Sequence, residues 1–198
     1  MPYRASTDPV DDWVAIDFET ATRARDSACA VGIAVVHEGS IVDAGSWLIR
    51  PPGNEYERWN VRIHGITPDR TQSAPSFGEL WPVLRGYLEE AHVLAHNASF
   101  DMGVLRALLA SSGLEPPDMH YVCTVLLARR AFPELPRHRL DTVCDHCGID
   151  LAHHDAASDA AACAAIALRC REAIGAPTVH EAVRACGLRP TRFSGPRG

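Results

Sequence analysis

Residues 13–20 read WVAIDFET, a mostly apolar run that ends in two carboxylates, Asp17 and Glu19. Such a run predicts a buried strand that emerges at the edge of a sheet. Because side chains alternate along a strand, Asp17 and Glu19 point to the same face. Two adjacent carboxylates repel each other, and a hard cation such as Mg²⁺, which takes oxygen ligands, resolves the conflict. The alternative is a pair of solvated acids at the end of a strand.

Two further segments carry acids near predicted helix starts. After an apolar stretch at residues 91–95, a helical pattern from Ser99 to Leu109 places Asp101 in the first turn of an amphipathic helix. Residues 153–160, HHDAASDA, lead into an alanine-rich helix with Asp159 in its first turn or so. An acid in a first turn can also serve only as a partner of the helix dipole.

His154 precedes that last helix and therefore lies on a loop. A histidine has an unperturbed pKa of roughly 6.5, so near neutral pH it can deprotonate a water that a metal has already made more acidic. This arrangement suits a general base. The alternative is a structural histidine in a chain that contains 10 of them.

Taken together, DFET, HNASFD and HHDAASD resemble the three motifs of the DEDDh family of 3′-to-5′ exonucleases. That family includes the proofreading epsilon subunit of bacterial DNA polymerase III, RNase T and oligoribonuclease. The similarity covers residues 12–172 and is greatest to short epsilon-like proteins that carry only the exonuclease domain. It implies an α/β, ribonuclease H-like exonuclease domain at 12–174, an N-terminal segment at 1–11, and a short helix with a flexible tail at 175–198.

The resemblance also implies a role for each acid. Asp17 would bridge two divalent metal ions, Mg²⁺ or Mn²⁺; Glu19 and Asp159 would complete one metal site, and Asp101 would support the other. His154 would activate the attacking water. The reaction would release nucleoside 5′-monophosphates from the 3′ end of single-stranded DNA. An RNA-trimming exoribonuclease of the RNase T or oligoribonuclease type, and a non-catalytic module that binds 3′ ends, are the alternatives.

Six further residues resemble substrate contacts of that family. They would line the cleft for the terminal nucleotide: Thr20, His64, Ile66, His96, Asn97 and Phe100. Stacking on an aromatic or apolar face suits an enzyme that accepts every base. A core position for Phe100, and a purely loop-shaping role for His64, are the alternatives.

The rest of the pattern predicts a mixed five-stranded sheet flanked by helices. Strands are expected at 12–18, 29–37, 40–49, 91–96 and 119–122, the first three antiparallel and the last two parallel. Ser76 and Glu79 form a capping pattern for a helix at 77–90, and Thr178 and Glu181 for a short helix that ends near Gly187. The residues beyond it are expected to form a loose tail.

Composition limits the function further. A chain of 198 residues with 46% hydrophobic residues suits one domain, and a net charge of −6 argues against a protein that coats nucleic acid. The densest basic stretch, Arg129, Arg130, Arg137 and Arg139, either guides a nucleic-acid strand or is a solvated helix end. Association with replication or repair proteins is possible on the family resemblance.

Cysteine content and hydropathy bear on location. The 7 cysteines, with no apolar stretch long enough for a membrane and no signal peptide, predict a reduced cytoplasmic protein without a membrane partner. Cys144 and Cys147 form a single CxxC with His138 and His146 nearby, so a zinc-dependent interaction domain is a further alternative. No second CxxC or HxxxH pair completes that site.

Overall fold

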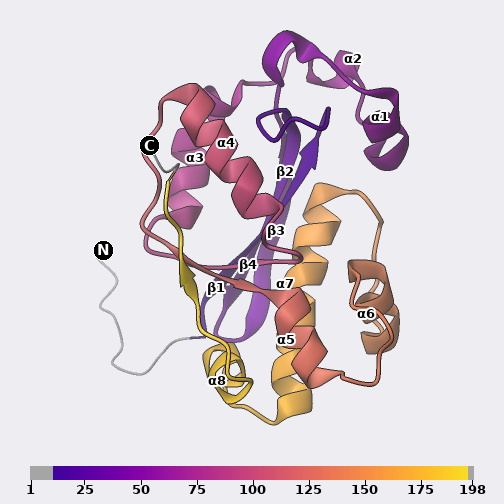
Figure 1. Ribbon diagram of the computed structural model, residues 1–198, viewed down its shortest axis with the longest axis vertical. Coiled ribbons are helices and arrows are strands. Elements are labelled where there is room, and N and C mark those ends of the chain that lie inside the picture. The colour runs from indigo at the N-terminus through magenta and orange to yellow at the C-terminus, as the bar shows by residue number, and fades with distance from the viewer. Residues whose placement is uncertain (1–10, 196–198) are drawn as a thin grey trace.

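A mixed sheet crosses the centre of the molecule in the computed structural model, which describes residues 11–195 (Figure 1). The segment predicted at 1–11 lies, except for Asp11, outside the described residues. Within them, the strands are β1 Trp13–Thr20, β2 Ala28–His37, β3 Ser40–Leu48, β4 His92–Ala95, β5 His120–Cys123 and β6 Thr191–Arg192. The helices are η1 Pro52–Asn54, α1 Arg58–His64, α2 Pro68–Thr71, α3 Phe77–Leu88, α4 Asp101–Ser112, α5 Thr124–Ala131, α6 Leu140–Cys147, α7 Ala156–Ile174 and α8 Val179–Ala185.

The strand order in the sheet is β3-β2-β1-β4-β5-β6. β1, β2 and β3 form an antiparallel meander, and β4 and β5 extend it in parallel with β1. The turn between β2 and β3 has positive φ at both Glu38 and Gly39, the conformation that matches the twist of a tight hairpin. The predicted directions of the first five strands are therefore confirmed.

Each face of the sheet is covered by its own helices. The even-numbered side chains of β1, Ile16 and Phe18, pack with α3 and α4, whereas Trp13 and Ala15 pack with α5 to α8. This alternation is the two-residue period of a strand buried on both faces. Asp17 and Glu19 belong to the odd-numbered series, so β1 presents them on the α7 side.

The predicted helix starts agree with the structure. The Ser76 hydroxyl accepts a hydrogen bond from the Glu79 N–H, and the Glu79 carboxylate accepts one from the Ser76 N–H, so the capping box is complete at the start of α3. The Thr178 side chain accepts from the Glu181 N–H at the start of α8. None of the helices in the described residues combines the length and the apolar character needed to cross a membrane.

Two regions differ from the sequence predictions. The expected loose tail contains β6, which pairs antiparallel with β5 and makes the sheet six-stranded. Phe193 behind it is only 4% exposed, and the Arg106 guanidinium lies 4.8 Å from the centre of its ring. These contacts, which no local pattern reveals, order the segment. The predicted loop around His64 is instead the end of α1, where Gly65 caps the helix in the left-handed conformation.

Candidate active site

The end of β1 supplies two carboxylates on the face that α7 covers. Asp17 lies opposite Gly32 of β2, and Glu19 lies opposite Ala30. The register then shifts between Glu19 and Thr20. An irregularity of this kind bends a strand and re-aims its side chains, and such features are common next to active sites.

Asp101 reaches the same region from the other side of the sheet. It is the first residue of α4 and is 1% exposed. Its Oδ1 accepts a hydrogen bond of 3.1 Å from the Phe18 N–H, between Asp17 and Glu19 in β1. This bond links the start of α4 to the strand that carries the other two acids. The bond joins residues 83 positions apart in sequence, and it brings Asp101 to the two carboxylates of β1.

The start of α7 brings the third element to β1. Asp155 caps the helix by accepting from the Ser158 N–H, and Asp159 follows in the first turn as a buried residue. The backbone N–H of His154 donates to Asp159 Oδ2 at 3.2 Å. His154 has a φ of 62°, which is uncommon for a residue with a side chain and occurs most often in functional or strained loops.

A glycine permits the close approach of α7 to the sheet. A Cβ atom on Gly32 would lie 1.7 Å from the carbonyl oxygen of Ala156, the first residue of α7. No side chain fits there, so the helix start rests directly on the β2 backbone. Because Gly32 is also the β-sheet partner of Asp17, this contact sets the separation of Asp17 from the acid of α7.

The four acids share one electrostatic environment. Burial, and then the charges of Asp101, Glu19 and Asp159, raise the pKa of Asp17 well above its ordinary range. Burial, and then the same two aspartates, raise the pKa of Glu19 to about 8. Burial raises the pKa of Asp101 to about 7, against the opposing hydrogen bond from Phe18. Burial also raises the pKa of Asp159. Within residues 11–195 none of the four acids forms an ion pair with an arginine, so negative charge is concentrated at this place.

These residues fit a divalent cation. Ligand atoms of Glu19, His154 and Asp159 all lie within 4.8 Å of one another. Asp159 Oδ1 is buried and has no hydrogen-bond partner. A buried carboxylate oxygen without a donor is costly, and a bound cation is one way to satisfy it. The carboxylate oxygens of the acids are the type of ligand that Mg²⁺ and Mn²⁺ prefer.

Three of the predicted substrate residues form a buried group behind Glu19. Thr20 and His64 are each 8% exposed, and Ile66 is 6% exposed. The Ile66 N–H donates to His64 Nδ1 at 3.0 Å, so Nε2 carries the proton and donates to the Thr20 carbonyl at 3.2 Å. Burial lowers the pKa of His64 and favours this neutral form. His64 thus fixes the end of β1.

The other three predicted substrate residues lie at the turn before α4. They are His96, Asn97 and Phe100. His96 is half-buried: its Nδ1 accepts from the Thr124 hydroxyl at 2.9 Å, and its Nε2 donates to the His138 carbonyl at 3.0 Å. Burial lowers the pKa of His96 to about 4. Asn97 is exposed with a φ of 69°, and Phe100 is 37% exposed. Of the six predicted contacts, only Asn97 and Phe100 have exposed side chains.

Sequence reasoning missed two contacts near the acids. Gly32 had a recognisable signal, since an isolated glycine inside a strand often marks a close backbone approach. Arg25 had no such signal in the sequence. Its Nη1 donates to the Ser99 carbonyl at 3.0 Å and lies where a Cβ on Gly103 would be. It joins the loop after β1 to the start of α4.

The alternative zinc site has little structural support. Cys144 packs in the apolar core against α7, and the His138 Nε2 donates to the Phe132 carbonyl at 2.9 Å. The grouping of metal-ligating atoms found among residues 11–195 consists of Glu19, His154 and Asp159, without either cysteine of the CxxC.

Comparisons with known proteins agree with this geometry. The chain is 30% identical over 146 residues to the PolC-type DNA polymerase III of Bacillus cereus, covering 73% of this chain and 10% of that protein. It is 33% identical over 161 residues to the PolC-type enzyme of Thermotoga maritima, covering 79% of this chain and 12% of that protein. The chain therefore spans about a tenth of the length of these relatives.

Solved structures show the same fold. A structure of exonuclease X in complex with 5′-overhanging duplex DNA has a TM-score of 0.70 at 24% identity and covers 88% of this chain and 99% of that one. A full-length 3′-exonuclease has a TM-score of 0.71 at 18% identity and covers 91% and 85%. The model of the family described as Exonuclease matches residues 14–167. Because that match includes most of the chain, the chain belongs to this exonuclease family.

Proposed function

We propose that the domain is a metal-dependent exonuclease that removes nucleotides from the 3′ end of single-stranded DNA and releases nucleoside 5′-monophosphates. The observation that carries this proposal is the gathering of Asp17, Glu19, Asp101 and Asp159 from three separate segments into one electronegative cluster, in which the two acids of β1 are half-buried and the other two are buried. Grouping four acids away from water is unfavourable unless cations join them. Membership of the exonuclease family supports the same conclusion.

The cluster would hold two divalent ions, Mg²⁺ or Mn²⁺. Asp17 would contact both ions, Glu19 and Asp159 would complete one site, and Asp101 would support the other. The unpartnered Oδ1 of Asp159 is a ready ligand atom. When bound, the ions supply Lewis-acid stabilisation of the attacking and leaving oxygens of a phosphodiester. In the described part of the chain, no arginine forms an ion pair with the four acids, so their oxygens are free to bind the ions.

His154 would act as the general base. Its ring reaches Glu19 and Asp159 oxygens within 4.8 Å, yet the side chain is exposed, so it can take a proton from the attacking water and release it to solvent. The hydrogen bond from its backbone to Asp159 positions the residue without occupying the ring. His153 precedes it, with ring centres 5.2 Å apart, but is absent from the ligand grouping.

Single-stranded DNA is the substrate that we favour. Exonuclease I has been solved with a dA13 oligonucleotide, and its structure resembles this chain with a TM-score of 0.68 at 20% identity. The sequence relatives are replication polymerases, so an association with replication or repair proteins is part of the proposal. All 7 cysteines are free thiols, in keeping with the cytoplasmic location that we propose.

Digestion of matched substrates labelled at the 5′ end tests this function. The substrates are single-stranded DNA, duplex DNA and RNA of one sequence, each incubated with Mg²⁺ or Mn²⁺. We expect a ladder that shortens by one nucleotide from the 3′ end and proceeds fastest on single-stranded DNA. Cutting of closed circular strands would refute an exonuclease. Equal or faster trimming of RNA would move the substrate to RNA, a possibility raised by a structural neighbour that recognises a histone mRNA stem-loop.

A further inference from the structure

Two adjoining cavities lie beside the turn that precedes α4. The first, about 410 Å³, lies between α5 and the segment that leads into β6. The second, about 700 Å³, lies between α5 and the loop at 133–139. Asn97, Val125 and Arg129 line both cavities. We call the two together the arginine groove. Its lining includes Asn97, Ala98 and Ser99 of the turn that leads into Asp101, so the groove lies next to the candidate active site.

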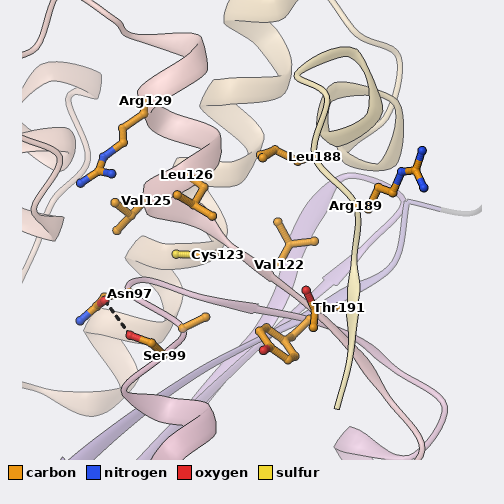
Figure 2. A pocket seen from close by; sticks show the side chains of 12 residues that line it. Asn97, Ser99, Val122, Cys123, Val125, Leu126, Arg129, Leu188, Arg189 and Thr191 are labelled. Atoms are coloured by element: carbon orange, nitrogen blue, oxygen red, sulfur yellow. Dashed lines mark hydrogen bonds between the residues drawn. The ribbon is translucent and has the colours of Figure 1, made fainter. Parts of the chain in front are cut away.

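The arginine groove lies at the carboxyl ends of the parallel strands, where ligands of such sheets usually bind. β1, β4 and β5 are parallel neighbours, and their carboxyl ends carry in turn the acids, the Asn97 turn and the start of α5. Ligands of such sheets bind at the carboxyl ends of the strands. Figure 2 shows Val125 and Leu126 of α5 on one side of the first cavity, with Leu188 and Thr191 of the C-terminal segment on the other.

The charge of the groove is opposite to that of the chain. The protein has 25 acidic and 19 basic residues, yet neither cavity has an Asp or Glu in its lining. The arginines of the groove are exposed. Arg139 pairs with Asp141 at 3.7 Å, but within residues 11–195 no carboxylate forms an ion pair with Arg129, Arg137 or Arg189. Two other cavities each include a carboxylate, Asp26 in one and Asp12 in the other. Uncompensated arginines beside apolar walls suit a polyanion with apolar faces.

Hydrogen bonds hold one wall of the groove in place. The His96 ring donates to the His138 carbonyl, and the His138 ring donates to the Phe132 carbonyl, which holds the loop carrying Arg137 against the end of β4. Leu126 is 46% exposed on the neighbouring helix. An exposed apolar side chain between cationic ones is the arrangement on which bases stack while phosphates meet the charges.

We propose that the arginine groove binds the single-stranded DNA on the 5′ side of the nucleotide being removed. The proposal rests on the exonuclease function and names the part of the domain that selects single strands of sufficient length. From β1 to β6 the sheet extends three strand spacings, about 14 Å at about 4.8 Å each. A stacked strand advances about 3.4 Å per nucleotide, so the path from the acids on β1 to the far end of the groove has room for about four nucleotides.

Arg129→Ala and Arg130→Ala form a matched pair that tests the groove. Both residues are exposed on the last turn of α5, but only Arg129 lines the cavities. Arg130 lies instead near Cys186, where burial raises the pKa of the thiol and the charge of Arg130 opposes that rise. The assay is single-turnover removal of the 3′ nucleotide from DNA strands between two and twelve nucleotides long. Thermal melting checks that both variants fold.

For the wild type we expect kcat/KM to rise with strand length up to about five nucleotides and then to level off. Arg129→Ala should lower kcat/KM about two- to fivefold on long strands, the worth of one exposed charge pair, and leave the dinucleotide unaffected. Combining it with Arg137→Ala and Arg189→Ala should reduce the dependence of log kcat/KM on log salt by about 0.7 for each arginine. Arg130→Ala should match the wild type.

Three outcomes would refute the proposed DNA-binding role of the groove without refuting the exonuclease function. They are a wild-type rate independent of length, equal effects of Arg129→Ala and Arg130→Ala, and a loss on the dinucleotide as large as that on long strands. A wild-type protein that cleaves no strand of any length, with either metal, would instead refute the exonuclease function itself, and the groove with it.

Discussion

Gly32→Ala should show how far activity depends on the position of α7, because the substitution changes none of the proposed catalytic side chains. The new Cβ would lie 1.7 Å from the Ala156 carbonyl oxygen and 2.9 Å from the Ala157 nitrogen. These are backbone atoms, so no side chain can rotate away. Ordinary van der Waals contact begins at 3.4 Å, and α7 must therefore retreat from β2 by about 1.7 Å. Asp159 and His154 lie within one turn of that contact and would move with the helix start.

A misplacement of about 1 Å can cost about 10²-fold in rate, so we expect Gly32→Ala to lose at least that factor in kcat/KM on single-stranded DNA. Gly45→Ala is the matched control, because Gly45 lies on the neighbouring strand β3 and a Cβ there meets no heavy atom within 4 Å. Circular dichroism and thermal melting establish that both variants are folded at the assay temperature. Activity of Gly32→Ala within about twofold of Gly45→Ala would refute the idea that this contact sets the active-site geometry.

Other perturbations test separate features. His154→Ala should keep binding to single-stranded DNA in Ca²⁺ but lose roughly 10² to 10⁴-fold in single-turnover rate, whereas His153→Ala should be mild; a larger defect in His153→Ala would reassign the base. Without metal, the melting temperature should fall as the pH rises from about 4.5 to about 8, because burial raises the pKa of Glu19 from 4.5 to about 8 and the folded state keeps a proton that the unfolded state has already lost. A divalent cation should remove this fall, and a melting temperature that rises over the same window would contradict the raised pKa. Gly103→Ala should leave stability unchanged or raise it by up to about 1 kcal/mol, since its Cβ meets only the flexible tip of Arg25; a loss above about 1 kcal/mol in denaturant unfolding would show that this tip cannot move.

The acids and the central strands could be predicted from the sequence because their signals are local. Alternation in residues 13–20 placed Asp17 and Glu19 on one face, and the helical spacing after residue 98 placed Asp101 in a first turn. The capping pairs gave the starts of α3 and α8. That the acids meet came from the family resemblance, since no local pattern states which segments lie together.

The remaining features depend on tertiary contacts. β6 is two residues long, too short for any periodicity, and it is ordered by pairing with β5 and by burial of Phe193. His64 resembled a substrate contact, but its ring is enclosed between Thr20 and Ile66, a position fixed only when α1 packs on the end of β1. The arginine groove likewise combines α5, the 133–139 loop and the C-terminal segment, which only the fold brings together.

Release of nucleoside 5′-monophosphates from single-stranded DNA, measured across a Mg²⁺ titration for wild type and Asp17→Asn, tests the central claim most directly. Asn is nearly isosteric with Asp but lacks its charge, so the variant should keep its fold by circular dichroism and lose nearly all activity. The wild type should release 5′-monophosphates in proportion to bound Mg²⁺ and none in excess chelator. Wild-type turnover by Asp17→Asn at every Mg²⁺ concentration, or release that persists in chelator, would contradict a metal-dependent centre built on these acids.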